Sequence, residues 1–184
     1  MWGNLIEILG CGFAAGLLVI APDINEVLLR LLLYLMAWGS FVFFPHCLAH
    51  FVVGRTVGIQ FSNYSSGRSS ISKLHMPVIS AMATRAPLLT LHIEKASLNA
   101  SSRGRRAVMF ASGAAASMIF PFFVAVASLP HLPSSLSLIL FVLSSVNLAF
   151  DFYYSPKAGD LSRIIAHRRI TRIALIFRVP FSGA

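Results

Sequence analysis

Charged side chains are scarce in this sequence, and acidic ones are the scarcest. Of the 184 residues, 57% are hydrophobic and 11% are charged, whereas about 25% are charged in a typical soluble domain. Water is therefore not the main solvent of this chain. Several apolar runs reach the length of about 18 residues that is typical of bilayer spans. The sequence thus predicts one integral membrane domain, with the lipid bilayer as its first partner.

Cysteine is also rare, and the two residues present, Cys11 and Cys47, both lie in apolar stretches. A disulfide framework is therefore not expected. Lys and Arg, 15 in all, outnumber the 6 Asp and Glu, a balance that suits nucleic acid, a ribosome or anionic lipid as a neighbour. The sequence resembles no nucleic-acid reader module and has no aromatic stacking platform. We attribute the excess to membrane topology, and keep nucleic acid or a ribosome as the alternative.

Four apolar segments are candidates for membrane-spanning helices: 5–21, 27–53, 107–129 and 135–153. No basic stretch precedes the first segment and no small-residue cleavage site follows it, which favours an anchored helix over a secretion signal. Pro45 lies inside the second and predicts a kink, because proline removes one helical hydrogen bond. The predicted fold class is an all-α membrane protein with about four transmembrane helices.

The distribution of Lys and Arg orients these spans. Segment 54–106 holds eight of them and one acid, and the tail after Tyr154 holds six and one acid. The connection between the first and second spans carries Asp23 and Glu26 instead. The connection between the third and fourth spans, 130–134, has neither Lys nor Arg. The positive-inside rule then predicts a multi-pass protein with both termini in the cytoplasm.

Segment 54–106 has no apolar run long enough to cross the bilayer, and its alternating stretches predict a small β-rich segment between the second and third spans. The expected strands are 59–61, 76–79 and 88–93, and the expected turns are 65–67 and 99–104. An open sheet edge cannot face lipid, so we expect the sheet at the interface or packed against the helices.

The tail, 157–184, intersperses arginines with isoleucines and a leucine, a pattern typical of a basic amphipathic helix. We expect it to lie on the cytoplasmic leaflet, where each Lys or Arg near anionic lipid contributes about 1 kcal/mol. An acidic partner protein or RNA is the alternative.

Two histidines, His46 and His50, stand four residues apart in the second span. This spacing places both imidazoles on one face of a helix, one turn apart. Such a pair suits Zn²⁺, which takes nitrogen or sulfur ligands in a tetrahedron and needs further ligands from elsewhere in the chain. The alternative is that both histidines form hydrogen bonds to neighbouring helices or lie at the interface.

Two later motifs extend this pattern. Asn147-Leu148-Ala149-Phe150 lies near the end of the fourth span, and Asp160-Leu161-Ser162-Arg163 follows it. In order and spacing across most of the chain, the sequence resembles the site-2 protease family of intramembrane zinc metalloproteases. In that family a His-Glu-x-x-His helix and a later Asn-Leu-x-Pro…Pro-x-Asp-Gly-Gly-Arg segment build the zinc site, and Ala111-Ser112-Gly113 stands where the family often has Ala-Gly-Pro.

The resemblance implies roles for particular residues. His46, His50 and Asp160 would be the zinc ligands, Asn147 would match the asparagine associated with substrate binding, and Arg163 would match the arginine that follows the aspartate. It also implies a transmembrane protein substrate or partner subunits. Small residues at 111–117 predict a close approach between helices.

Two departures from the family motifs bear on activity. Cys47 replaces the glutamate of His-Glu-x-x-His, which normally accepts the proton of the zinc-bound water; transfer of this kind contributes roughly 10² to 10⁴ in rate. The second motif reads Asp160-Leu161-Ser162 in place of Asp-Gly-Gly, and its distance from Asn147 is several residues longer. We interpret Cys47 as a packing residue. Asp151 is a better placed substitute base than Glu94, although we favour the interpretation of Asp151 as an interfacial acid that pairs with Arg or Lys at the helix end.

Two functions follow from these features. The first is a zinc-dependent intramembrane endopeptidase with an atypical base. The second is a catalytically silent relative, a pseudoenzyme that keeps the fold to bind another protein in a membrane assembly. Loss of the glutamate favours the second.

Overall fold

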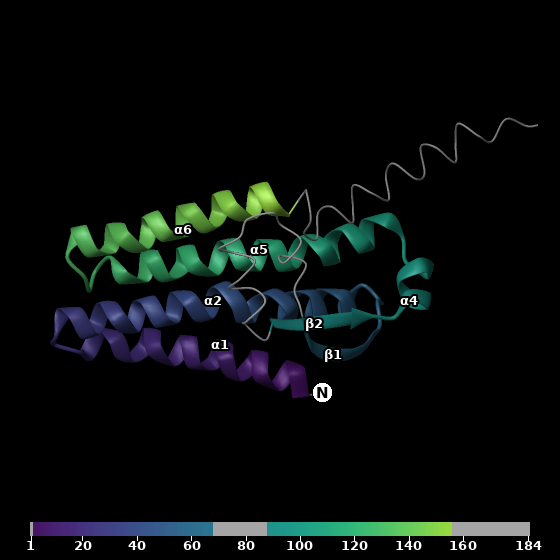
Figure 1. Cartoon of the computed structure of the whole chain (residues 1–184), viewed down its shortest axis with the longest axis horizontal. Coiled ribbons are helices and arrows are strands. Elements are labelled where there is room, and N and C mark those ends of the chain that lie inside the picture. Colours follow the sequence, from purple (N-terminus) through teal and green to yellow (C-terminus); the bar gives the residue numbers. More distant parts are fainter. Residues whose placement is uncertain (1, 68–87, 156–184) are drawn as a thin grey trace, which may run out of the picture.

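The computed structural model describes residues 2–67 and 88–155, and most of them are helical (Figure 1). Four helices are long and apolar enough to cross a membrane: α1 (Trp2–Ile20), α2 (Val27–Thr56), α5 (Arg103–Ser128) and α6 (Ser134–Tyr154). They match the four predicted spans, with α1, α2 and α5 each three or four residues longer at one end. The chain is therefore a multi-pass integral membrane protein, and the predicted fold class is confirmed.

The four helices lie side by side in chain order, each antiparallel to the next (Figure 1). A short 3₁₀ turn, η1 (Ala21–Asp23), joins α1 to α2, and the largest interface is between α2 and α5. Helix α2 continues through Pro45 to Thr56. Helices α2 and α5 thus lie in the middle of the row, with α1 and α6 on the outside.

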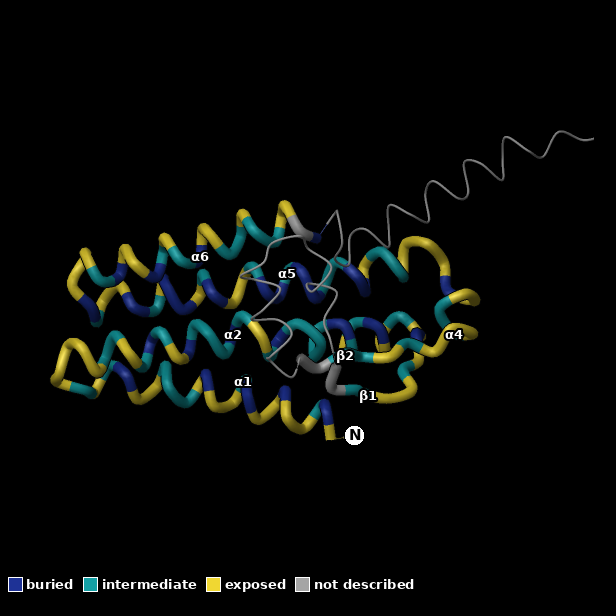
Figure 2. Tube along the Cα trace, in the orientation of Figure 1, coloured by how far each residue is buried: buried dark blue, intermediate teal, exposed yellow. Residues whose placement is uncertain are grey.

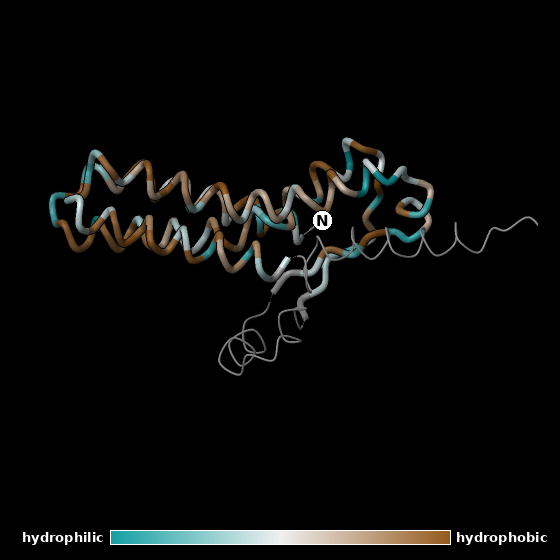
Figure 3. The backbone as a smooth tube through the Cα atoms, turned by 90° about the horizontal axis from the view of Figure 1, so that it is seen from above, coloured by the Kyte–Doolittle hydropathy of each residue, from teal (hydrophilic) through white to brown (hydrophobic). Residues whose placement is uncertain are grey.

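Apolar side chains cover the outside of the bundle. Leu28 is 77% exposed and Trp2 is 80% exposed, an exposed apolar surface of the kind that marks membrane contact. Figure 2 shows the buried positions on the sides of the helices that face one another, and Figure 3 shows hydrophobic residues along the helices with hydrophilic ones gathered at the ends. Many of the buried positions are small, such as Ala14, Ala37 and Ala125, which allows close helix packing.

Arg30 connects the two loops at the end of the bundle away from the sheet. Its Nε donates to the carbonyl of Ile24 at 2.8 Å, and its terminal nitrogens donate to the carbonyls of Ile24 and His131. Backbone carbonyls of both connections, α1–α2 and α5–α6, thus bind the guanidinium group. This explains how an arginine can lie near the start of an apolar span.

A two-stranded antiparallel sheet lies at the opposite end, formed by β1 (Phe61–Gly67) and β2 (Leu88–Ile93). The prediction of a strand at 88–93 is confirmed, and so is the small β-rich segment. The strand predicted at 59–61 was placed too early, because β1 begins only at Phe61. The expected strand 76–79 lies outside the described residues.

The two predicted turns need correction. Residues 65–67 form the end of β1 because they pair with β2, where Ser65 also contacts the His92 ring at 2.7 Å. The expected turn at 99–104 is partly wrong, since its first two residues belong to α4 (Lys95–Ala100) and its last two to α5. Only Ser101 and Ser102 separate these helices, and the Ser102 hydroxyl accepts the amide of Arg105 at 3.4 Å, which caps α5.

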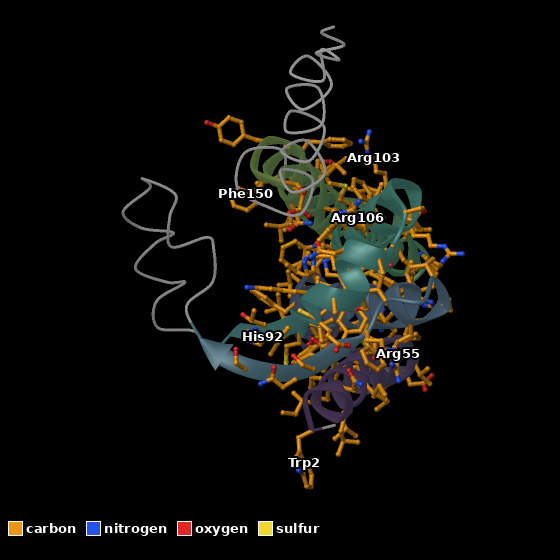
Figure 4. The ribbon with its side chains drawn as sticks, turned by 90° about the vertical axis from the view of Figure 1, so that its right-hand side faces the viewer. Trp2, Arg55, His92, Arg103, Arg106 and Phe150 are labelled. Carbon is orange, nitrogen blue, oxygen red and sulfur yellow. The ribbon has the colours of Figure 1, made fainter. Side chains whose placement is uncertain are left out.

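The sheet packs on the bundle through a small apolar cluster. Ile59, Met109 and Phe110 are buried there, with Phe61 and Ile93 packed against them. Gly58 makes the turn that precedes β1 with a φ of 84°, a conformation that favours glycine. Figure 4 looks at this end, where Arg55, Arg103 and Arg106 lie around the ends of α2 and α5.

Candidate metal centre

His46 and His50 lie on the face of α2 that packs against α5. Their ring centroids are 4.8 Å apart and the rings are perpendicular, edge to face. The predicted placement on one helical face, one turn apart, is therefore confirmed. His50 is buried, with 8% of its surface exposed, and His46 is half-buried.

Helix α5 contacts each of the two histidine rings at the same ring nitrogen, Nδ1. The Nδ1 of His50 lies 2.7 Å from the carbonyl oxygen of Met109, and the Nδ1 of His46 lies 2.8 Å from the Ser117 hydroxyl. A carbonyl can only accept, and the Ser117 hydroxyl donates its own proton to the Gly113 carbonyl at 3.2 Å. Each Nδ1 therefore carries a proton and donates, a tautomer assigned from these partners. In this tautomer Nε2 carries the lone pair.

This is the arrangement found at ligating histidines, which donate one ring N–H to a carbonyl or similar acceptor so that the other nitrogen can bind the metal. The alternative prediction, hydrogen bonds to a neighbouring helix, is met by the same contacts. The two interpretations are compatible, because the bonds to α5 use Nδ1 and a metal would use Nε2.

Gly113 lets α5 come close to the histidine pair. A Cβ at this position would lie 2.2 Å from the Nε2 of His50, so any side chain here would displace the ring. The close approach predicted for the small residues of 111–117 is present at this point.

Asn147 reaches the same part of α5 from α6. Its Nδ2 donates to the Ser117 carbonyl at 2.9 Å. That carbonyl has lost its usual helical donor, because the residue four positions later is Pro121, which has no N–H. Asn147 thus satisfies the buried carbonyl of the same residue whose hydroxyl contacts His46. The role in substrate binding implied by the family remains a prediction.

Glu7 is the site residue that the sequence reasoning missed. It lies on α1, is 2% exposed, and belongs to a buried face that also contains Gly3, Gly10 and Ala14. The sequence contained a signal for it, because a glutamate at helical spacing among small residues inside an apolar span marks a polar group that faces the protein interior.

The surroundings of Glu7 link α1 to the histidine helix. The Tyr64 hydroxyl lies 3.2 Å from its Oε2 and also contacts the Asn4 side chain. The Cys47 thiol is in hydrogen-bond contact with the Glu7 carboxyl, and His50 lies close enough to interact with it electrostatically. Burial raises the pKa of Tyr64, and the neighbouring Glu7 raises it further. Cys47 therefore lies toward α1.

Two of the described residues could act as zinc ligands. His46 and His50 offer two imidazoles in the ligating tautomer, which fits half of a zinc tetrahedron. Within residues 2–67 and 88–155, no third His, Cys, Asp or Glu completes a metal-binding group with them. The predicted third ligand, Asp160, lies outside this part of the chain, as does Arg163. Asp151 lies one turn after Asn147 on α6, and its role as a base stays a prediction.

Comparisons with protein-family models, with curated proteins and with solved structures give no match for this chain.

Proposed function

We propose that this chain is a site-2-protease-like membrane protein that binds zinc through His46, His50 and Asp160 and serves as a binding subunit of a membrane assembly. One observation supports the metal site above all others, namely that α5 fixes both imidazoles through Nδ1. Two histidines held this way by the same neighbouring helix keep Nε2 as the nitrogen that would bind a metal. The third ligand, Asp160, is assigned from the order of the motifs in the sequence.

When bound, zinc would act as a Lewis acid that polarises a carbonyl or activates a water. The chain's own residues orient the site: Met109 and Ser117 fix the imidazoles, and Asn147 fixes Ser117. Cys47 lies at the position of the missing glutamate, and a thiol among apolar side chains is a poor proton acceptor. We therefore favour binding over hydrolysis.

The second candidate is an active intramembrane endopeptidase, and Glu7 is the observation that favours it. An acid in contact with Cys47 lies beside the position from which the family glutamate acts. An assay on a model transmembrane substrate separates the candidates by comparing this protein with its Cys47→Glu variant. Equal cleavage by both would overturn the binding-subunit proposal in favour of the peptidase.

We place the sheet end of the bundle in the cytoplasm. Arg55, Arg103, Arg105 and Arg106 lie at or near that end, and the loop at the other end carries Asp23 and Glu26. The even number of described spans puts the start of α1 and the end of α6 on the same side. The predicted lipid-binding helix at 157–184 lies outside the described residues and stays a prediction.

Metal analysis of the purified protein tests the zinc site. We expect zinc to copurify with the unmodified protein and to be lost from His46→Ala. His131→Ala is the matched control, since His131 lies in the loop between α5 and α6 at the far end of the bundle. Equal zinc in His46→Ala and His131→Ala would overturn the ligand assignment.

A further inference from the structure

We propose that exposed arginines at the sheet end of the bundle bind the phosphate groups of anionic phospholipids. Three of them form this surface, which we call the arginine edge: Arg55 in the last turn of α2, and Arg103 and Arg105 in the first turn of α5. The arginine edge is separate from the histidine pair and from the tail at 157–184. The proposal therefore adds a ligand to the proposed function and does not depend on zinc.

The arginine edge lies where α2 ends beside the start of α5. A Cβ at Gly54 would lie 3.2 Å from the side chain of Met109, so the residues that follow Gly54 are neighbours of the turn that precedes Met109. Figure 4 shows Arg55 and Arg103 on the side of the bundle away from His92. The positive charges thus come from two adjacent helix ends.

The depth of the arginine edge in the membrane follows from the packing of α1 on α2. Gly10 packs against the Phe44 ring, and the two helices are antiparallel, so Trp2 lies level with Val52. Trp2 is 80% exposed, and exposed Trp is enriched at the membrane–water interface. Arg55 is three residues further out, about 4.5 Å along the helix axis. The headgroup layer is about 5 to 7 Å thick on each side of the hydrocarbon core, so Arg55 lies within it.

Exposed apolar side chains lie next to the arginines on the side toward the membrane. Val52 is 50% exposed one turn from Arg55, and Val108 is 55% exposed one turn from Arg105. The Arg55 guanidinium also lies over the Phe51 ring, 5.9 Å from its centroid, which favours a cation at an apolar surface. A phospholipid offers a phosphate to the arginines and acyl chains to the valines. RNA or an acidic protein segment offers only the negative charge.

Acidic side chains leave the arginine edge with net positive charge. Among the described residues, Glu94 is the only exposed acid at the sheet end, and it is followed directly by Lys95, the first residue of α4. Each basic residue near an anionic membrane surface strengthens binding about five-fold. Three exposed arginines therefore predict a clear preference for anionic over zwitterionic lipid.

Native mass spectrometry of the purified protein in non-ionic detergent tests this preference without any effect of membrane insertion. We expect the unmodified protein to bind short-chain phosphatidylglycerol more tightly than the matching phosphatidylcholine. Arg55→Gln, Arg103→Gln and Arg105→Gln should each weaken phosphatidylglycerol binding about five-fold and leave phosphatidylcholine binding unchanged. Lys95→Gln is the matched control, because Lys95 is exposed on α4 outside the arginine edge, and its affinity should not change.

The triple Arg→Gln variant at positions 55, 103 and 105 decides between the arginine edge and other surfaces. If it binds phosphatidylglycerol as tightly as the unmodified protein, another surface binds the lipid and the proposal is wrong. The triple Arg→Lys variant should keep most of the affinity, because it keeps the charge. Thermal unfolding in detergent shows for each variant that the bundle is folded.

Competition separates the possible ligands. Inorganic phosphate that displaces phosphatidylglycerol at equal concentration would identify a site for the free ion and overturn the lipid assignment. An RNA oligonucleotide that binds more tightly than the lipid and is lost from the triple Arg→Gln variant would overturn it in favour of nucleic acid. The zinc content of the triple Arg→Gln variant should match that of the unmodified protein, so either proposal can fail without the other.

Discussion

Ser117 joins three helices at a single residue. Its hydroxyl accepts from His46 on α2, and its carbonyl accepts from Asn147 on α6, while the residue itself belongs to α5. The second contact exists because Pro121 cannot donate to that carbonyl. A proline within the span thus creates the acceptor that ties α6 to the histidine site.

This account predicts coupling between Asn147 and Pro121. In the unmodified background, Asn147→Ala leaves the Ser117 carbonyl without that donor and should destabilise the bundle by about 0.6 to 1.7 kcal/mol. In a Pro121→Ala background the alanine amide takes over as donor, so the same change should cost close to nothing. A double-mutant cycle of unfolding in detergent measures the difference. Equal cost in both backgrounds would show that Asn147 does not act through this carbonyl.

Gly113 gives a second prediction at this scale. Gly113→Ala places a Cβ against the His50 ring, and overpacking of this kind costs about 1 to 3 kcal/mol. We expect lower thermal stability together with loss of zinc. Gly104→Ala, on the same helix, is the control, because a Cβ there meets nothing within 4 Å, and it should be neutral or stabilising by up to about 1 kcal/mol. A Gly113→Ala variant as stable as Gly104→Ala would refute the close contact.

At the scale of elements, α1 is more than an anchor. Its buried face brings Glu7 to Cys47, and its first turn receives Tyr64 from β1. The sheet is therefore docked on the helix that carries the acid. This arrangement makes the β-rich segment part of the site's support.

The contact between Tyr64 and α1 predicts a pH dependence. Because the pKa of Tyr64 is raised in the folded protein, the folded state holds the phenol proton above pH about 10, where an unfolded chain releases it. The stability that Tyr64 contributes is fully present below that pH and is lost as the pH rises further. Unfolding in detergent should show this alkaline loss in the unmodified protein and a smaller one in Tyr64→Phe. Equal losses in both would contradict the buried contact.

How much of the structure the sequence predicts differs from element to element. The spans were predictable, because long apolar runs leave a helix as the main structure compatible with lipid. The strand conformation of Ser65 was not predictable, because a polar stretch becomes a strand only through the partner strand with which it pairs. The histidine pair was found by its spacing, whereas Glu7 was missed because its partners come from two other elements, β1 and α2.

At the scale of the whole molecule, the four spans place the candidate site and a group of basic residues at the same end. The histidine contacts, Glu7 and the sheet all lie toward the end where α1 begins and α6 finishes, and the loops held by Arg30 lie at the other end (Figure 1). If the basic end is cytoplasmic, the proposed site lies in the cytoplasmic half of the membrane.

Cysteine labelling tests this orientation. In a background with Cys11 and Cys47 replaced by alanine, an impermeant thiol reagent applied to intact cells should label Glu26→Cys. It should label Lys95→Cys only after permeabilisation, because both positions are exposed but lie at opposite ends of the bundle. The reverse pattern would invert the topology.

The central claim is that α2 presents two imidazoles to one zinc ion while Cys47 lies toward α1. X-ray absorption at the zinc edge of the purified protein measures this directly. We predict at least two imidazole nitrogens at about 2.0 to 2.1 Å and no sulfur at about 2.3 Å, with the imidazole signal reduced in His50→Ala. A sulfur ligand, or a spectrum unchanged by His50→Ala, would contradict the account.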